Sequence, residues 1–186
     1  MSRNPSSLAT LRKLARRRYP TDIELKEFFD YLTTAEDRAF AIIAATALED
    51  AIELAIRNKM IRHELRDLFG SDKPLGSFNA KVHMAFALGI IGPKSCDDLE
   101  VIRLVRNAFA HNGQKIDFNT PAVALACERL TMPERCEATG NDIHSLEKIT
   151  EARERYRVSA TLYQMSLIRR SRVRLAKDIP PPPPLD

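Results

Sequence analysis

The sequence predicts an all-α fold, a bundle of several helices. Apolar residues recur at three- and four-residue steps through long segments, as the core-facing side of a helix requires. The 186 residues include only 6 glycines and no tryptophan, and they are rich in Ala, Leu, Ile, Arg and Glu, which favours helix over sheet. No segment alternates apolar and polar residues as a half-buried strand does. A chain of this length can bury a core as one domain.

The ends of the chain differ from its middle in composition. Residues 1–20 form a basic N-terminal arm, expected to contain a short helix capped by Ser6 or Ser7 and ended by Pro20. Residues 21–178 are the predicted helical bundle domain. Residues 179–186 contain five consecutive prolines, which we expect to form an extended, disordered tail that takes no part in the core.

The first two helices of the bundle are predicted from caps and periodicity. Thr21 with Glu24 three residues later is a capping box that starts a helix. The apolar positions of this helix are Ile23, Leu25, Phe28, Phe29 and Leu32. The longest helix signal spans residues 34–60, and its predicted core face is Phe40, Ile43, Ala47, Ala51, Leu54 and Ala55. A shorter helical segment follows over residues 61–69.

Glycine and proline divide the middle of the chain. Gly70 to Gly76 is a predicted turn, Ser77 a predicted N-cap, and Gly92-Pro93 a predicted helix stop. The apolar face of the helix between them is Phe78, Val82, Ala85, Phe86 and Gly89. Ser95 is expected to open the next helix, with Asp97 and Asp98 in its first turn, where the helix dipole favours acidic residues.

This next helix is expected to run to His111 and to end at Asn112-Gly113. Its buried stripe is Leu99, Ile102, Val105 and Phe109. Thr120-Pro121 then starts a short helix, because proline suits the first helical position. Residues 131–145 are predicted to be an irregular connection. A last helix is predicted from about Leu146 to Leu175, with Tyr156, Ala160, Tyr163 and Leu167 on one face.

The formal net charge is only +4, but Lys and Arg cluster near both ends. The basic residues of the arm are candidate contacts to nucleic acid or to an acidic protein partner: Arg12, Lys13, Arg16, Arg17 and Arg18. A solvated surface or an acidic partner is the favoured interpretation, because neither basic stretch resembles a recognition helix. Only steep salt dependence would indicate direct nucleic-acid binding.

The composition also excludes several kinds of site. Cys96, Cys127 and Cys136 form no C-x-x-C pair, which predicts reduced thiols rather than a disulfide framework or a zinc site. No two histidines have metal-ligand spacing, so neither a metal nor a cofactor is expected. No apolar run approaches the roughly 20 residues that cross a bilayer, and the N-terminus has no apolar signal region. These features predict a cytoplasmic protein without a membrane partner.

The segment "RNAFAH" carries the strongest candidate site: Arg106, Asn107 and His111. In metal-free RNA cleavage a histidine can transfer protons while an arginine holds the phosphate. On an ideal helix, residues five apart point roughly 140° away from each other, so convergence requires a frayed helix end at His111. The alternative is structural: Arg106 pairs with Glu49 or Asp50 of the long helix, and His111 ends its own helix.

This segment resembles the RNxxxH pattern of the HEPN family of helical domains, which includes metal-independent ribonucleases whose arginine and histidine meet across a dimer interface. The resemblance implies a HEPN-like bundle and places the motif on Arg106, Asn107 and His111. Other family members use the fold only for binding.

A longer resemblance is to the mannitol operon repressor family, and it extends from about Arg38 to His111. It is carried by "RAFAIIAATALEDAIELAI", "LFGSDKPLGSFNAKVHMAFALGIIG" and "DLEVIRLVRNAFAH". The residues that we expect to form a structural or interaction motif are Glu49, Asp50, Gly76, Ser77, Phe78, Lys81, Arg106, Asn107 and His111. The resemblance implies a homodimeric, non-enzymatic regulator of transcription that works through protein partners. The alternative is a HEPN-type ribonuclease that uses Arg106 and His111.

Overall fold

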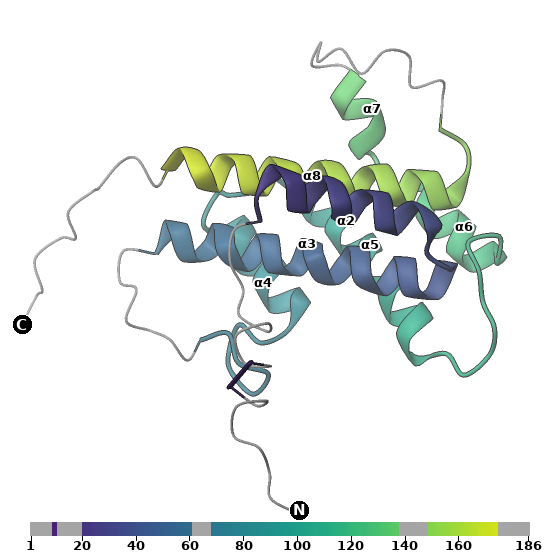
Figure 1. Cartoon of the computed structure of the whole chain (residues 1–186), viewed down its shortest axis with the longest axis horizontal. Coiled ribbons are helices and arrows are strands. Elements are labelled where there is room, and N and C mark those ends of the chain that lie inside the picture. The colour runs from purple at the N-terminus through teal and green to yellow at the C-terminus, as the bar shows by residue number, and fades with distance from the viewer. Residues whose placement is uncertain (1–8, 11–19, 61–67, 138–148, 175–186) are drawn as a thin grey trace, which may run out of the picture.

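The computed structural model describes residues 9–10, 20–60, 68–137 and 149–174. These residues form helices packed as a bundle and contain no strand, which confirms the all-α prediction (Figure 1). The helices are α2 (Asp22–Thr34), α3 (Asp37–Lys59), α4 (Phe78–Ala87), α5 (Pro93–His111), α6 (Pro121–Glu128), α7 (Met132–Glu137) and α8 (Ala152–Arg174). Within the described residues, none of the helices has the length and hydropathy to span a membrane.

Some expectations lie outside these residues. They are the basic helix of the N-terminal arm, nearly all of the helical segment predicted over 61–69, and the proline-rich tail.

The centre of the bundle is the pair α3 and α8, which lie side by side and run in the same direction (Figure 1). Near their N-terminal ends, the Tyr156 hydroxyl donates to the Ala41 carbonyl at 3.0 Å. Near their C-terminal ends, Asn58 Nδ2 donates to the Ser171 carbonyl at 2.8 Å. Burial raises the pKa of Tyr156, so its hydroxyl stays a neutral donor. The predicted buried face of α8 is confirmed at Tyr156, Ala160, Tyr163 and Leu167.

The buried face of α3 differs in part from the prediction. Phe40, Ala51 and Ala55 are buried as expected, but Ile43, Ala47 and Leu54 are only half-buried. The rest of the buried apolar face is Ala41, Ala44, Ala45, Leu48, Ile52 and Ile56. The buried arc is wider and rotated because α3 packs against α8 on one side and against α4 and α5 on another. Its alanines leave room for these helices to approach closely.

The capping box of α2 is confirmed, since Glu24 N donates to Thr21 Oγ1 at 3.3 Å and Thr21 N donates to Glu24 Oε2 at 2.8 Å. Its predicted apolar face is only partly buried. Leu32 is buried, while Ile23 is 72% exposed, because α2 packs mainly against α3 alone.

The turn before α4 requires glycine at position 76. A Cβ atom there would lie 2.2 Å from the Gly70 carbonyl oxygen, far inside van der Waals contact. The turn is closed by a hydrogen bond from Leu75 N to the Leu68 carbonyl at 2.8 Å. Ser77 then caps α4 as predicted, because its Oγ accepts from Ala80 N at 3.1 Å.

The predicted end of α4 and the predicted start of α5 were wrong. Gly89, with φ of +64°, ends α4 in a Schellman motif in which Ile90 N donates to the Ala85 carbonyl. Gly92 is the N-cap of α5 and Pro93 its first residue, so the helix begins before Ser95. Phe86 is 46% exposed and Gly89 is also exposed, so neither belongs to the buried face.

The rest of α5 matches the expectation. Its stripe of Leu99, Ile102, Val105 and Phe109 is buried, and Asn112 is its C-cap. The earlier start moves Asp97 and Asp98 out of the first turn.

The C-terminal part of the bundle holds two further corrections. Pro121 begins α6 as predicted, but α7 occupies part of the stretch expected to be irregular, and α8 begins at Ala152 rather than Leu146. The buried Arg155 side chain explains this path. Its guanidinium donates to the Ile149 carbonyl, which holds the non-helical chain before α8. It also donates to the Leu130 carbonyl and pairs with Glu134 at 2.7 Å, which holds the α6–α7 connection and α7 against α8.

Candidate functional site

A chain of charged side chains joins α3 to α4. The Lys81 ammonium lies 2.7 Å from Glu49 Oε1 and 3.1 Å from Glu53 Oε2. Lys81 is 1% exposed and Glu53 is 2% exposed, and Arg57 pairs with Glu53 at 3.0 Å. Ions buried this deeply require partners, because each loses its hydration shell. The cluster therefore fixes α4 against α3 in one arrangement.

The turn and cap before α4 position Lys81. The tight backbone at Gly76 leads into the Ser77 cap, and Phe78 is buried at the first position of the helix. Lys81 follows one turn later and points at α3. Gly76, Ser77 and Phe78, which were singled out from the sequence, thus orient Lys81, which was singled out with them. Asp50, which was also singled out, is half-buried on α3 beside Glu49.

Arg106 extends the charged chain to α5. Its Nη2 lies 3.7 Å from Glu49 Oε2, so the predicted ion pair with the long helix is present and its partner is Glu49. Its Nη1 donates to Asn107 Oδ1 at 3.0 Å. Arg106 is 29% exposed, so one edge of the network reaches the surface. We call the residues Glu49, Glu53, Arg57, Lys81 and Arg106 the charge network.

His111 lies apart from Arg106. It is the last residue of α5 and is exposed, and the helix is regular up to it. Because both residues belong to one regular helix, their side chains leave it in directions that differ by roughly 140°. The frayed end that would let them converge within one chain is not observed. The structure thus joins Glu49, Lys81, Arg106 and Asn107 and leaves His111 separate.

Other sequence candidates do not form a site in the described part of the chain. Arg12, Lys13, Arg16, Arg17 and Arg18 lie outside the described residues. No group of histidine, cysteine and acidic side chains in the described ranges could hold a metal ion. Cys96 and Cys127 are free thiols. Burial raises the pKa of the Cys127 thiol to about 12.

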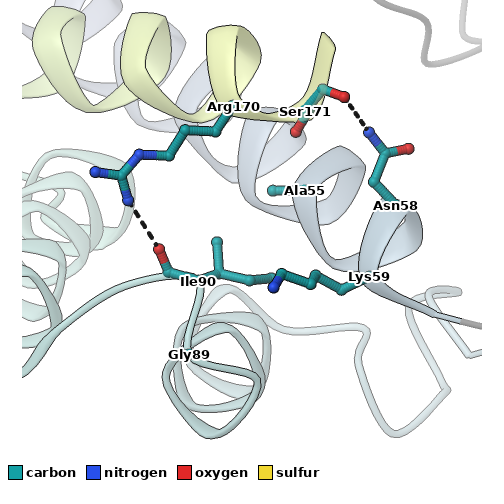
Figure 2. Close-up of a pocket in the computed structure, with 7 residues that line it drawn as sticks. All are labelled: Ala55, Asn58, Lys59, Gly89, Ile90, Arg170 and Ser171. Atoms are coloured by element: carbon teal, nitrogen blue, oxygen red, sulfur yellow. Dashed lines mark hydrogen bonds between the residues drawn. The ribbon is translucent and has the colours of Figure 1, made fainter. Parts of the chain in front are cut away.

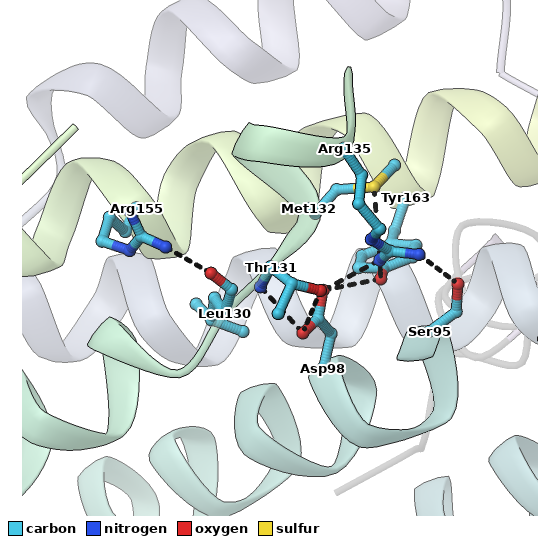
Figure 3. Close-up of polar contacts among 8 residues, drawn as sticks. All are labelled: Ser95, Asp98, Leu130, Thr131, Met132, Arg135, Arg155 and Tyr163. Atoms are coloured by element: carbon cyan, nitrogen blue, oxygen red, sulfur yellow. Dashed lines mark hydrogen bonds and ion pairs between the residues drawn. The ribbon is translucent and has the colours of Figure 1, made fainter. Parts of the chain in front are cut away.

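Sequence reasoning missed a second polar cluster, which lies between α5, α7 and α8 (Figure 3). The Asp98 carboxylate, 1% exposed, accepts from Thr131 N at 2.9 Å, from Arg135 Nη2 at 3.0 Å and from the Tyr163 hydroxyl at 2.8 Å. Arg135 also donates to the Tyr163 oxygen and to Ser95 Oγ. Burial raises the pKa of Tyr163, which keeps its hydroxyl protonated as a donor to Asp98.

One signal could have revealed Asp98. It lies four residues before Ile102 and so on the buried face of the helix. Its place near the predicted helix start favours the simpler interpretation of an acidic residue that suits a helix N-terminus.

Two hollows flank the C-terminal half of α8. One, of about 280 Å³, is lined by residues that include Asn58, Lys59, Arg170 and Ser171 (Figure 2). The other, of about 470 Å³, lies beside the Asp98 cluster and shares Ile90 and Arg170 with the first.

The comparisons with known proteins give a distant similarity. The chain is 24% identical over 87 residues to the mannitol operon repressor of Escherichia coli strain K12, and equally to that of strain O6:H1. The match covers 44% of this chain and 45% of each relative, so it spans less than half of the length of these proteins. No family model matches the chain, and no solved structure matches it.

Proposed function

We propose that this protein is a non-enzymatic regulator of transcription that acts through protein partners. The observation that carries the proposal is the use of Arg106, which pairs with Glu49 of the charge network and donates to Asn107. A side chain engaged in this way links α5 to α3, which supports a structural role for Arg106. The distant similarity to mannitol operon repressors supports a regulatory role.

The competing function is a HEPN-type, metal-independent ribonuclease that uses Arg106, Asn107 and His111. Within one chain Arg106 and His111 diverge, so this function needs the histidine of a second copy. Only a dimer in which two α5 helices face one cleft would supply it.

We also propose that the protein forms a homodimer. Phe86 on α4 and Leu104 on α5 are 46% and 51% exposed on two helices that pack against each other. Contiguous apolar patches on a surface mark interaction sites, and we propose that these two side chains belong to one. Sedimentation equilibrium at micromolar protein should give twice the monomer mass, and Leu104→Asp should lower it. A wild-type protein that sediments only as a monomer would contradict the dimer.

A genetic experiment separates the regulator from the ribonuclease. The gene is deleted in its own host, transcripts are measured, and the strain is complemented with wild type, His111→Ala or Lys94→Ala. A regulator predicts that deletion changes a defined set of transcripts and that His111→Ala restores them as wild type does. If the protein is a ribonuclease, His111→Ala should fail to restore these transcripts. Lys94→Ala is the control for a surface change of α5 outside both the motif and the proposed dimer surface.

The same purified proteins are then tested on RNA and DNA. Single-stranded RNA incubated in metal chelator should remain intact with wild type and with His111→Ala. Cleavage by wild type that disappears in His111→Ala would overturn the proposal. Affinity for DNA that falls steeply between 50 and 200 mM salt would instead indicate direct nucleic-acid binding.

A further inference from the structure

The cavity beside the Asp98 cluster has the size and lining of a small-molecule site. Its volume is about 470 Å³, within the range of roughly 300–1,000 Å³ that ligand pockets occupy. It lies between the start of α5, α7 and α8, and no residue of the charge network lines it. One part of its lining is apolar and consists of Ile91, Met132 and Leu167.

The polar part of the lining carries positive charge. Arg135 and Arg170 both line the cavity, and its lining residues include no carboxylate. Asp98, which lies beneath the wall, neutralises Arg135 at 3.0 Å. Arg170 donates only to the Ile90 carbonyl at 3.3 Å and has no ion pair among the described residues (Figure 2). Arg170 is exposed, and its guanidinium therefore lines this space with no counter-ion among the described residues.

Hydroxyl groups also line the cavity. Ser95 and Ser166 line the same cavity, and Figure 3 shows Ser95 beside the Arg135 guanidinium. The start of α5 forms part of the wall, and its N-cap Gly92 supplies no side-chain cap to the first turn. The partial positive charge of that turn adds to the charge of Arg170.

We propose that this cavity binds a small organic phosphate monoester. Arg170 and the two serine hydroxyls hold the phosphate, and Ile91, Met132 and Leu167 contact the carbon body. A phosphate is favoured over a carboxylate because it offers three terminal oxygens to donors that come from several directions, and a guanidinium matches its geometry. The evidence for this site does not depend on the proposed regulatory function. If the protein is a regulator, the site would give that regulator a small-molecule ligand.

Isothermal titration calorimetry with phenyl phosphate at low salt tests the site on the full chain. Wild type should bind one equivalent. Phenol and inorganic phosphate should each bind at least about tenfold more weakly. Phenol lacks the phosphate that Arg170 would hold, and inorganic phosphate lacks the ring that the apolar lining would contact. Benzoate should also bind more weakly than phenyl phosphate. Tighter binding of benzoate would overturn the assignment to a phosphate.

Two substitutions locate the site. Arg170→Gln keeps a donor for the Ile90 carbonyl but removes the charge, and it should weaken phenyl phosphate binding by about tenfold or more. Arg169→Gln is the matched control: the same charge is lost from the preceding residue of α8, which is exposed like Arg170 but does not line the cavity. Ser166→Leu, which fills the cavity, should abolish binding.

Three results would refute the proposal. The first is no saturable binding of phenyl phosphate up to 10 mM. A dissociation constant of 10 mM corresponds to a binding free energy of about −2.7 kcal/mol, so any binding would be weaker than this. The second is an equal loss in Arg169→Gln and Arg170→Gln, which would indicate only general surface charge. The third is unchanged affinity in Ser166→Leu when its circular dichroism spectrum matches that of wild type.

Discussion

Lys81 is the residue whose removal most strongly tests the charge network. Lys81→Met keeps the apolar stem and removes the ammonium that lies 2.7 Å from Glu49 and 3.1 Å from Glu53. Removing one partner of a buried ion pair costs roughly 3–5 kcal/mol, because a buried charge loses its partner. Arg57 and Arg106 remain to neutralise part of this charge. We therefore expect a loss of about 3 kcal/mol in the free energy of unfolding.

Arg106→Ala should cost much less than Lys81→Met. The Arg106–Glu49 pair, at 3.7 Å, has a gross Coulomb energy of about 4 kcal/mol at an effective dielectric of about 20. Arg106 is 29% exposed, so solvent screens the pair, and Glu49 keeps Lys81 as a partner. A net loss of about 1 kcal/mol follows. A fully buried pair, in which Glu49 had no other partner, would have cost roughly 2–4 kcal/mol.

Urea unfolding followed by circular dichroism at 222 nm measures these differences. The set is wild type, Lys81→Met, Arg106→Ala, Glu53→Gln and the double variant Lys81→Met with Glu53→Gln. The double variant should be more stable than the sum of its two single changes predicts, by at least about 1 kcal/mol, because the two ions interact directly. Equal m-values in all variants confirm that the midpoints report stability.

Two outcomes would contradict this reasoning. If Arg106→Ala destabilised as much as Lys81→Met, Arg106 would be the main partner of Glu49 and the ordering by burial would be wrong. If Lys81→Met lowered the free energy of unfolding by less than about 1 kcal/mol, the loss would be that of an exposed ion pair. Lys81, Glu49 and Glu53 would then not be coupled as their distances imply.

Three further predictions concern single residues. Gly76→Ala should cost more than about 2 kcal/mol because its Cβ would collide with a loop carbonyl at 2.2 Å; an unchanged melting temperature would contradict this. The raised pKa of Tyr156 favours the neutral phenol in the folded state, so its stability is intact below about pH 10 and falls at higher pH. Tyr156→Phe should therefore lose less stability than wild type between pH 9 and 11, in urea unfolding at each pH. Cys127 is fully buried and its pKa is about 12, so iodoacetamide at pH 8 should not modify it in the folded protein. Mass spectra should show alkylation of the less buried Cys96 instead. Equal alkylation of both cysteines would place Cys127 at the surface.

Local signals explain which parts of the fold could be predicted. The capping box at Thr21 and the cap at Ser77 depend on residues three apart in the chain. The stripe of α5 is clear because that helix buries a single face, from Leu99 to Phe109. Features of this kind are set by near neighbours, so the sequence alone suffices to predict them.

The errors arise where distant segments decide. The sequence places Gly89 on an apolar helix face and the stop at Gly92-Pro93, whereas Gly89 adopts the left-handed conformation that ends α4. The start of α8 depends on Arg155, whose partners come from the α6–α7 connection and from the chain before α8. Periodicity contains no information about such contacts.

The candidate site was predicted in the same uneven way. The pairing of Arg106 with the acidic residues of α3 followed from charge alone, and it is present at Glu49. Lys81 was singled out by a motif, but its position between Glu49 and Glu53 depends on how α4 packs against α3. The Asp98 cluster was missed because Arg135 and Tyr163 lie 37 and 65 residues away in sequence.

The pairing of α3 with α8 also sets the order of events during protein synthesis. Ala41 and Tyr156, which are bonded in the core, are 115 residues apart. Ribosomes add roughly 5–20 residues per second, so α3 waits about 6 to 23 s for the helix that covers it. Through that interval its alanine- and leucine-lined face has no α8 to pack against. A nascent chain released before Ala152 would lack α8 and keep this face uncovered, and we expect chaperones and proteases to recognise it.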